Sequence, residues 1–388
     1  MFKIFNYNPS HFFARRLKRP MRELYLSVAI MDFATAAVTI FEPIYFYTIG
    51  YSVAKILLFY LGMYALYFAI MPLGAKYANA RGYEKSILIS TFFLIAFYLC
   101  LYALPLVPWL VYFAAAAIAL QKMFYWPGYH ANFASFSDES EQAREISTLK
   151  VINDLVYVLG PLLGGLIITL ASFNALFIVV IVLIMVSNLP FLLTEERVTP
   201  KPFSYGDAYK KLIHPKRRRR LFAYMGFGEE LVVMVIWPIF IYLIIKSYWK
   251  IGSVIALATL VTALVTLFVG RICDKHRKHP VIKLGSILYL ISWWLRYLAS
   301  STGLIFLADT LSRISKNMIY VPVIAITYLK ARRHDVMNRV LFLEMALVVG
   351  KMLALVSIFL VIQFFGLSAG FVFAFLLAGA MSLLYNFL

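Results

Sequence analysis

Apolar residues in this chain form long runs, and short segments between the runs hold most of the polar and charged residues. Twelve runs cover residues 23–49, 53–77, 85–104, 108–130, 147–170, 173–193, 220–245, 251–270, 280–300, 303–329, 337–365 and 367–387. Most approach or exceed the roughly 20 residues that a helix needs to cross about 30 Å of hydrocarbon. Because the runs are long and lack strict alternation, they predict helices rather than barrel strands. We therefore predict an all-α membrane protein with twelve transmembrane helices.

One tract of the chain is repeated. Residues Met123 to Arg144 resemble residues Met318 to Arg339, with Pro127 and Pro322 at equivalent places before the two arginines. A second, similar pair is residues 29–43 and 223–238, at a shift that is one residue different. The pattern predicts two six-helix halves related by a pseudo-two-fold axis, an arrangement typical of secondary transporters, whose substrate site lies between the halves.

The longest polar connection separates the two predicted halves. We expect an N-terminal six-helix bundle over 1–196, a cytoplasmic linker over 197–218 and a C-terminal six-helix bundle over 219–388. Prolines and a basic run mark the linker, and a short surface helix is expected around residues 205–213.

Composition places the chain in lipid. Hydrophobic residues make up 63% of it and charged residues only 14%, too few to cover the surface of a water-soluble domain of 388 residues. Lys and Arg gather at the N-terminus and in every second loop, so the positive-inside rule predicts that both termini are cytoplasmic. This distribution argues against nucleic acid as a partner for the net charge of +19 and favours anionic lipid headgroups.

Several other classes of function are disfavoured. The first apolar run is too long for a cleavable signal peptide and contains Asp32 and Glu42. Cys100 and Cys273 are placed too differently to form a disulfide or a metal site. No P-loop and no catalytic arrangement is recognisable. We expect no enzymatic activity, no cofactor and no metal, and we expect a monomer in the cell (inner) membrane.

Three local motifs carry a resemblance to a known family. Residues 270–278, with Gly270, Asp274 and Lys275, have the pattern G-x-x-x-D-[RK]-x-x-[RK], and the loop that begins at Gly74 is a degenerate copy. Residues 160–165 read Gly-Pro-Leu-Leu-Gly-Gly. With the predicted topology and repeat, the chain resembles the major facilitator superfamily over its whole length. The resemblance implies alternating access, with spans 1, 4, 7 and 10 lining a central cavity.

The motif residues have physical roles of their own. A small-residue face of Gly160, Gly164 and Gly165 permits close helix packing, and Pro161 should bend its helix. Ordinary packing without any role in transport explains this face equally well. We expect a cytoplasmic latch in which Asp274 approaches Ser147 or an arginine. The gate candidates are Gly74, Arg144, Gly270, Asp274, Lys275 and Arg339.

Charges at membrane depth are costly, so each retained one indicates a role. The candidates are Asp32, Glu42, Lys122, Asp154, Glu229, Glu230, Asp309, Arg313, Lys316, Glu344 and Lys351. Asp309, Arg313, Lys316, Glu344 and Lys351 could form structural ion pairs or hold a substrate. Arg296 lies beside Trp293 and Trp294 and is expected at the membrane interface.

Acids without an obvious cation nearby are the preferred coupling residues. Asp32, Glu42, Glu229 and Glu230 fit this description, with Asp154 as a further candidate, and Thr35 and Thr39 lie on the same helix face as Asp32. We expect at least one of Glu229 and Glu230 to hold a proton, because adjacent carboxylates repel each other and burial disfavours their charged forms.

The substrate is weakly specified. Tyr125, Trp126, Trp237 and Tyr320 predict aromatic cavity walls, or are simply packing residues, whereas the cations suit an anionic substrate. We favour proton-coupled efflux of a small organic molecule by antiport. The alternatives are proton-coupled uptake of an organic anion, and a non-transporting receptor or lipid-handling protein on the same scaffold.

Overall fold

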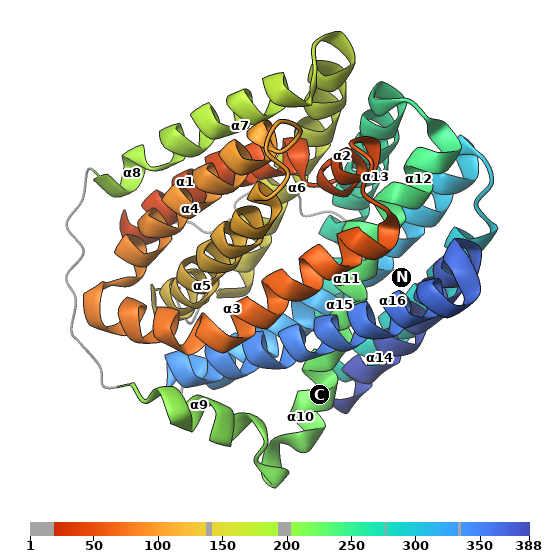
Figure 1. Ribbon diagram of the computed structural model, residues 1–388. Coiled ribbons are helices and arrows are strands. Elements are labelled where there is room, and N and C mark those ends of the chain that lie inside the picture. Colours follow the sequence, from red (N-terminus) through yellow and green to blue (C-terminus); the bar gives the residue numbers. More distant parts are fainter. Residues whose placement is uncertain (1–18, 137–141, 193–202, 276–277, 333–334) are drawn as a thin grey trace.

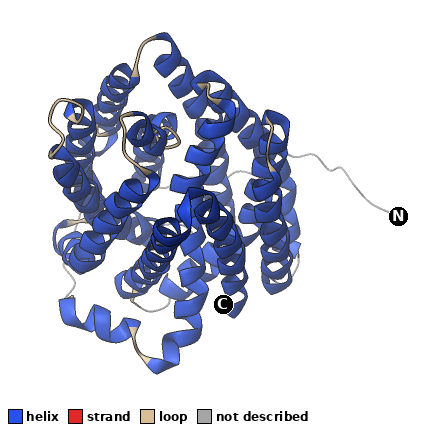
Figure 2. Ribbon diagram, turned by 45° about the vertical axis from the view of Figure 1, so that its right-hand side comes forward, coloured by secondary structure: helices blue, strands red, loops and turns tan. Residues whose placement is uncertain are grey.

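The computed structural model describes residues 19–136, 142–192, 203–275, 278–332 and 335–388. Within the helices, the side chains of residues 19–24, 134–136, 142–153, 191–192, 266–275, 278, 329–330 and 332 lie outside this description. In the described part all regular structure is helical (Figures 1 and 2). We call residues 19–192 the first half and residues 215–388 the second half.

Helices of the first half coincide with the first six apolar runs. They are α1 (Arg19–Val38), α2 (Glu42–Thr48), α3 (Val53–Arg81), α4 (Tyr83–Ala103), α5 (Leu110–Phe136), α6 (Gln142–Leu170), α7 (Phe173–Ser187) and α8 (Leu189–Leu192). The predicted surface helix is present as α9 (Tyr205–Leu212). It lies at the same end of the bundle as the C-terminus (Figure 1).

The second half contains the remaining helices. They are α10 (Arg218–Met225), α11 (Glu229–Leu231), α12 (Trp237–Ile245), α13 (Tyr248–Lys275), α14 (Lys278–Leu298), α15 (Thr302–Arg332) and α16 (Val336–Ser382). The run from 220 to 245 is helical but irregular, because a 3-10 turn spans Gly226–Gly228 and a π-helical turn spans Val232–Ile236. Such turns often occur at functional sites.

The longest helix contains a change of direction. At Gly366 the backbone has φ 84°, a left-handed conformation that only glycine adopts without strain, so α16 consists of two helical parts. The break falls between the predicted runs 337–365 and 367–387. Two long runs are thereby joined by a minimal turn.

Seven helical segments in the described part are long and apolar enough to cross a membrane. They cover 25–48, 53–81, 83–103, 215–245, 248–265, 279–298 and 336–387. The last is 52 residues long, which exceeds the length needed for one crossing. The chain is therefore a multi-pass helical membrane protein, while twelve spans and a two-fold relation of the halves stay predictions.

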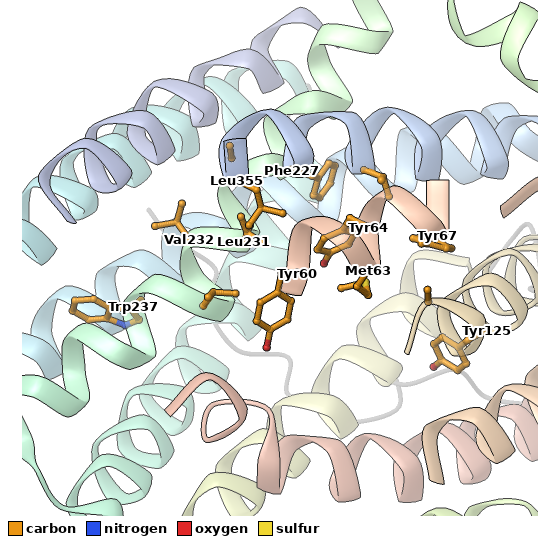
Figure 3. Packing of buried hydrophobic residues seen from close by; sticks show 14 of the residues in the cluster. Tyr60, Met63, Tyr64, Tyr67, Tyr125, Phe227, Leu231, Val232, Trp237 and Leu355 are labelled. Atoms are coloured by element: carbon orange, nitrogen blue, oxygen red, sulfur yellow. The ribbon is translucent and has the colours of Figure 1, made fainter. Parts of the chain in front are cut away.

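The halves meet along extended helix contacts. Helix α6 packs against α13, and α3 packs against α16, while α1 packs against α6 within the first half. Aromatic residues of α3 lie in this interior: Figure 3 shows Tyr60, Tyr64 and Tyr67 along that helix, with Leu355 of α16 and Phe227 nearby. Aromatic rings of α3 therefore lie at the interface between the halves.

Candidate functional site

Charged side chains from both halves meet around one aromatic ring. The ammonium group of Lys122 (α5) lies 6.0 Å from the centroid of the Tyr64 ring, and that of Lys351 (α16) lies 5.6 Å from it. Both distances are in the range of cation–π attraction. The ring of Tyr64 therefore joins a cation of the first half to one of the second. The residues that we call the central site are Asp32, Tyr64, Lys122, Glu230, Arg313, Lys316, Tyr320 and Lys351.

Two glutamates and two lysines form a connected network in the second half. The Lys316 ammonium group donates to Glu229 and lies 3.2 Å from Glu230 Oε1. Lys351 Nζ lies 3.0 Å from the other oxygen of Glu230. Glu229 is fully buried and also accepts hydrogen bonds from the hydroxyls of Tyr289, at 2.5 Å, and Tyr385, at 3.0 Å.

The environment of these two glutamates corrects one expectation. Sequence indicated few cations near Glu229 and Glu230, but Lys316 and Lys351 compensate both charges. The prediction failed because both lysines lie on other helices, 86 or more residues away along the chain. The expected shared proton therefore has no geometric support, because both carboxylates have cationic partners.

Asp32 differs from Glu230, the other acid in the central site. It is half-buried on α1, and its carboxylate forms neither a hydrogen bond nor an ion pair with the described residues. The neighbouring hydroxyls do not serve it, because Thr35 donates to backbone oxygens and Thr39 to Thr35 O, the latter at 2.7 Å. Tyr125, Tyr129 and Tyr157 lie within electrostatic range of the carboxylate. Asp32 is thus a carboxylate among phenols with no compensating cation bound to it.

Asp309 holds two arginines. Its carboxylate accepts from Arg296 at 2.9 Å and from Arg313 at 2.6 Å, and Trp237 Nε1 donates to it at 3.0 Å. Arg296 is only 1% exposed, and its guanidinium carbon lies 4.3 Å from the Trp293 ring centroid. The prediction that Arg296 sits at the membrane interface is wrong, because a buried acid on the next helix holds it inside.

Arg313 faces two environments. Its Nε binds Asp309, but 29% of its side chain is exposed, and it interacts electrostatically with Tyr157 of the first half. Since one carboxylate serves two guanidinium groups, the cluster of Arg296, Asp309 and Arg313 has one positive charge in excess. Because Arg313 belongs to the central site, this excess positive charge could interact with an anionic group there.

A polar cluster that the sequence did not indicate joins the halves. His130 Nε2 of α5 lies 3.1 Å from Glu344 Oε1 of α16, and Tyr67 of α3 donates to Glu344 Oε2 at 3.1 Å. The other ring nitrogen of His130 lies 2.5 Å from the hydroxyl of Tyr328 on α15. We call these four residues the inner clasp. Glu344 and Lys351, which were grouped in the sequence, therefore serve different clusters.

Aromatic rings join the halves at the opposite end. Tyr47 of α2 contacts Tyr242 of α12, with centroids 6.4 Å apart. Tyr248, at the start of α13, meets Phe41 and Phe173 at 6.4 Å and 5.3 Å. These ring contacts are edge-to-face, and the Tyr248 side chain also forms a hydrogen bond with Thr48 of α2. The two ends of the interface are thus closed by different chemistry.

The remaining candidates are two acids, Glu42 and Asp154, and the aromatic residues Tyr125, Trp126 and Trp237. Glu42 begins α2 and accepts a hydrogen bond from Tyr98 at 2.8 Å, and Asp154 is buried in α6. Trp126 stacks on the ring of His130, and Tyr125 packs against Trp126. Trp126 thus supports the inner clasp, Tyr125 lies between Trp126 and the surroundings of Asp32, and Trp237 donates to Asp309.

The glycine motif lies at close helix contacts. A Cβ at Gly164 would come within 1.8 Å of the Ala37 backbone oxygen of α1, and one at Gly165 within 2.5 Å of the Tyr248 oxygen of α13. Gly160 similarly meets Ala36. Helix α6 continues through Pro161. The motif therefore allows α6 to pack closely against α1 of its own half and against α13 of the second half.

The proposed gate is only partly visible. Gly74 lies against the Met123 backbone of α5, and Arg339 is half-buried near the start of α16. The side chains of Arg144, Asp274 and Lys275, and the surroundings of Gly270, lie outside the described residues. The latch around Asp274 therefore stays a prediction.

Comparisons with known proteins agree with one another. The sequence profile of the Major Facilitator Superfamily matches residues 24–245. Among solved structures, the transporter FucP in its outward conformation superposes with a TM-score of 0.67 at 13% identity, over 95% of this chain and 97% of that one. A variant of the E. coli fucose:proton symporter FucP gives 0.66 at 14% identity, with the same coverage. No curated protein sequence matches significantly.

Proposed function

The chain belongs to the Major Facilitator Superfamily, and from that premise we propose that it is a proton-coupled secondary transporter of a small organic molecule, working by alternating access. Members of the family are transporters rather than enzymes. The observation that carries the proposal is the contrast between Asp32 and Glu230, the other acid of the central site. Asp32 alone lacks a bound cation or hydrogen-bond donor among the described residues, so a proton is the partner left to it.

The division of the contacts supports alternating access. The inner clasp closes one end through polar bonds, and the aromatic contacts around Tyr248 close the other. Rocking of the two halves about the central site would break the contacts at one end of the interface while keeping those at the other end. A proton on Asp32 removes a charge that is costly in a closed, dry interior, so protonation would favour passage through the closed state.

Efflux by antiport is the direction that we propose first, because the tyrosines around Asp32 and Lys122 suit an amphipathic molecule. Proton-coupled uptake of an organic anion is the second candidate, and the excess positive charge at Arg313 favours it. The structural neighbour named as a fucose:proton symporter couples its substrate to protons in the same direction.

Purified protein in proteoliposomes tests the proposal. Compounds that raise the unfolding temperature at two pH values would be selected first, and each would then be followed with a pH dye trapped inside the vesicles. Antiport predicts that substrate and protons cross the membrane in opposite directions, whereas symport predicts that both cross in the same direction. Substrate flux that leaves the internal pH unchanged would exclude proton coupling, and absence of flux for every stabilising compound would favour the non-transporting alternative.

A further inference from the structure

Three arginines surround a small cavity where α10, α15 and α16 meet. The cavity has a volume of about 50 Å³ and is lined by Arg217, Arg220, Tyr224, Thr327, Arg339 and Phe342. It lies at the end of the bundle that the positive-inside rule assigns to the cytoplasm, away from the central site. We call it the arginine pocket.

No acid among the described residues forms an ion pair with the charges of the arginine pocket. None of its lining residues is acidic, and the guanidinium groups of Arg217, Arg220 and Arg339 repel one another. In the described part of the chain none of the three forms an ion pair. Asp335 interacts with Arg339 at longer range, but its carboxylate accepts from the backbone N–H of Asn338 at 3.1 Å and so caps α16. Like charges held together in this way favour an anion between them.

Other lining residues hold the pocket in shape. Tyr224 and Thr327 are buried and joined by a hydrogen bond of 2.8 Å between their hydroxyls. The guanidinium carbon of Arg217 lies 5.5 Å from the centroid of the Phe342 ring, which fixes the side chain by cation–π contact. One of the three arginines is therefore held in place before any ligand arrives, which lowers the entropy cost of binding.

We propose that the arginine pocket binds a phosphate group, either from the headgroup of an anionic phospholipid or from a soluble phosphate. Guanidinium forks match the oxygens of phosphate in pairs. The cavity is much smaller than the roughly 300–1,000 Å³ of pockets that enclose whole organic ligands, so it suits one such group. Basic pockets between helices at the cytoplasmic side are known to take phospholipid headgroups.

The pocket lies entirely in the second half. Its residues would keep their arrangement if the halves rock, and none of them belongs to the central site or to the inner clasp. Arg339 is also a predicted gate residue, but phosphate binding is measured without transport, so the proposal is tested separately from the proposed transport function.

Two arms of one experiment identify the source of the phosphate. The full chain in nanodiscs of phosphatidylcholine, with or without phosphatidylglycerol, is compared by native mass spectrometry for retained lipid. In detergent, its unfolding temperature is measured in inorganic phosphate and in chloride at equal ionic strength. Retention of phosphatidylglycerol supports the proposal with a lipid headgroup as the source, and a higher unfolding temperature in phosphate supports it with soluble phosphate as the source. Absence of both effects overturns the proposal.

Variants separate the pocket from general surface charge. Arg220→Gln with Arg339→Gln is expected to reduce the binding at least tenfold, whereas the charge-matched pair Arg218→Gln with Lys216→Gln, on exposed residues, should retain it. Arg220→Lys keeps the positive charge but loses the paired N–H donors of the guanidinium group, so it should reduce binding several-fold. This single variant tests the proposal even if the double variant folds poorly. Equal losses in the pocket and control pairs, or full binding by Arg220→Lys, would overturn the proposal.

Discussion

His130 on α5 binds Glu344 on α16 across the interface between the halves, with 3.1 Å between Nε2 and Oε1. The two residues are 214 positions apart in the chain, so only the tertiary fold brings them together. Tyr67 and Tyr328 complete the inner clasp from α3 and α15. Each half thus contributes two members.

Loss of the Glu344 charge should loosen the end of the interface that the inner clasp closes. Hydrogen bonds to charged groups contribute roughly 1.5–3 kcal/mol, so Glu344→Gln is expected to raise the population open at that end about 10- to 100-fold. Accessibility of a cysteine placed near Tyr67 to a water-soluble thiol reagent measures it. Asp207→Asn, an exposed acid on α9, serves as the control. Unchanged labelling in Glu344→Gln would remove the inner clasp from the mechanism.

Asp32→Asn should uncouple transport from the proton gradient. The amide has nearly the same shape but cannot gain or lose a proton, so accumulation driven by a pH gradient should disappear while substrate exchange continues. Flux in proteoliposomes with and without a gradient separates the two quantities, again with Asp207→Asn as control. Full gradient-driven flux in Asp32→Asn would shift the coupling role to Glu42 or Asp154.

Glu229 and Glu230 should differ in their effect on stability, although they are adjacent. Glu229 is 0% exposed with three partners, whereas the Glu230 side chain is 26% exposed. Removing one partner of a buried ion pair costs roughly 3–5 kcal/mol, so Glu229→Gln should lower the unfolding temperature clearly more than Glu230→Gln. Equal unfolding temperatures would contradict the burial of this network.

Arg296→Leu distinguishes a buried arginine from an interfacial one. An interfacial arginine would tolerate leucine, but here the change leaves Asp309 with Arg313 alone and removes the contact with Trp293. A loss of several kcal/mol is expected, measured as a fall in unfolding temperature in detergent. Tyr297→Leu, one residue further along and 48% exposed, should have little effect.

Gly164→Ala should force α1 and α6 apart. The added Cβ would lie 1.8 Å from the Ala37 oxygen, which is backbone and cannot move aside by itself. Overpacking of this kind costs about 1–3 kcal/mol or more. Gly62→Ala is a matched control, because nothing lies within 4 Å of its Cβ. Size-exclusion profiles and unfolding temperatures of the two variants give the comparison.

Helix positions were readable from the sequence because each apolar run must satisfy its own backbone in lipid, which only a helix does locally. The break at Gly366 illustrates this, since two runs abut there and only glycine fits the turn. The identity of charged partners was not readable, because pairing depends on which helices become neighbours. Arg296 was misassigned for that reason, as its tryptophan neighbours in sequence imitate an interfacial belt.

His130 was missed for a related reason. It is one imidazole at the end of an aromatic stretch, and nothing near it in sequence carries a complementary charge. A signal was present, since an ionisable residue at membrane depth invites a partner, and Glu344 on α16 was itself among the candidates. Only the packing of α3, α5 and α16 showed that the two belong together.

Helix α9 is attached to the halves unequally. Tyr205 and Tyr209 donate to the Ala69 backbone oxygen of α3 at 2.7 Å and 3.0 Å, and burial raises the pKa of Tyr209. Its hydrogen bond to α16 comes from one flexible side chain, Lys211, which donates to Asn338 at 2.7 Å, and α9 also packs against α16. Because α9 packs against both halves, rocking would have to break one of its two attachments, and the single Lys211–Asn338 bond is the weaker one. The linker would then act as a brace across this end of the interface rather than as a slack connection. The residues left to change conformation are Ile213 and His214, between α9 and the 3-10 turn Pro215–Arg217.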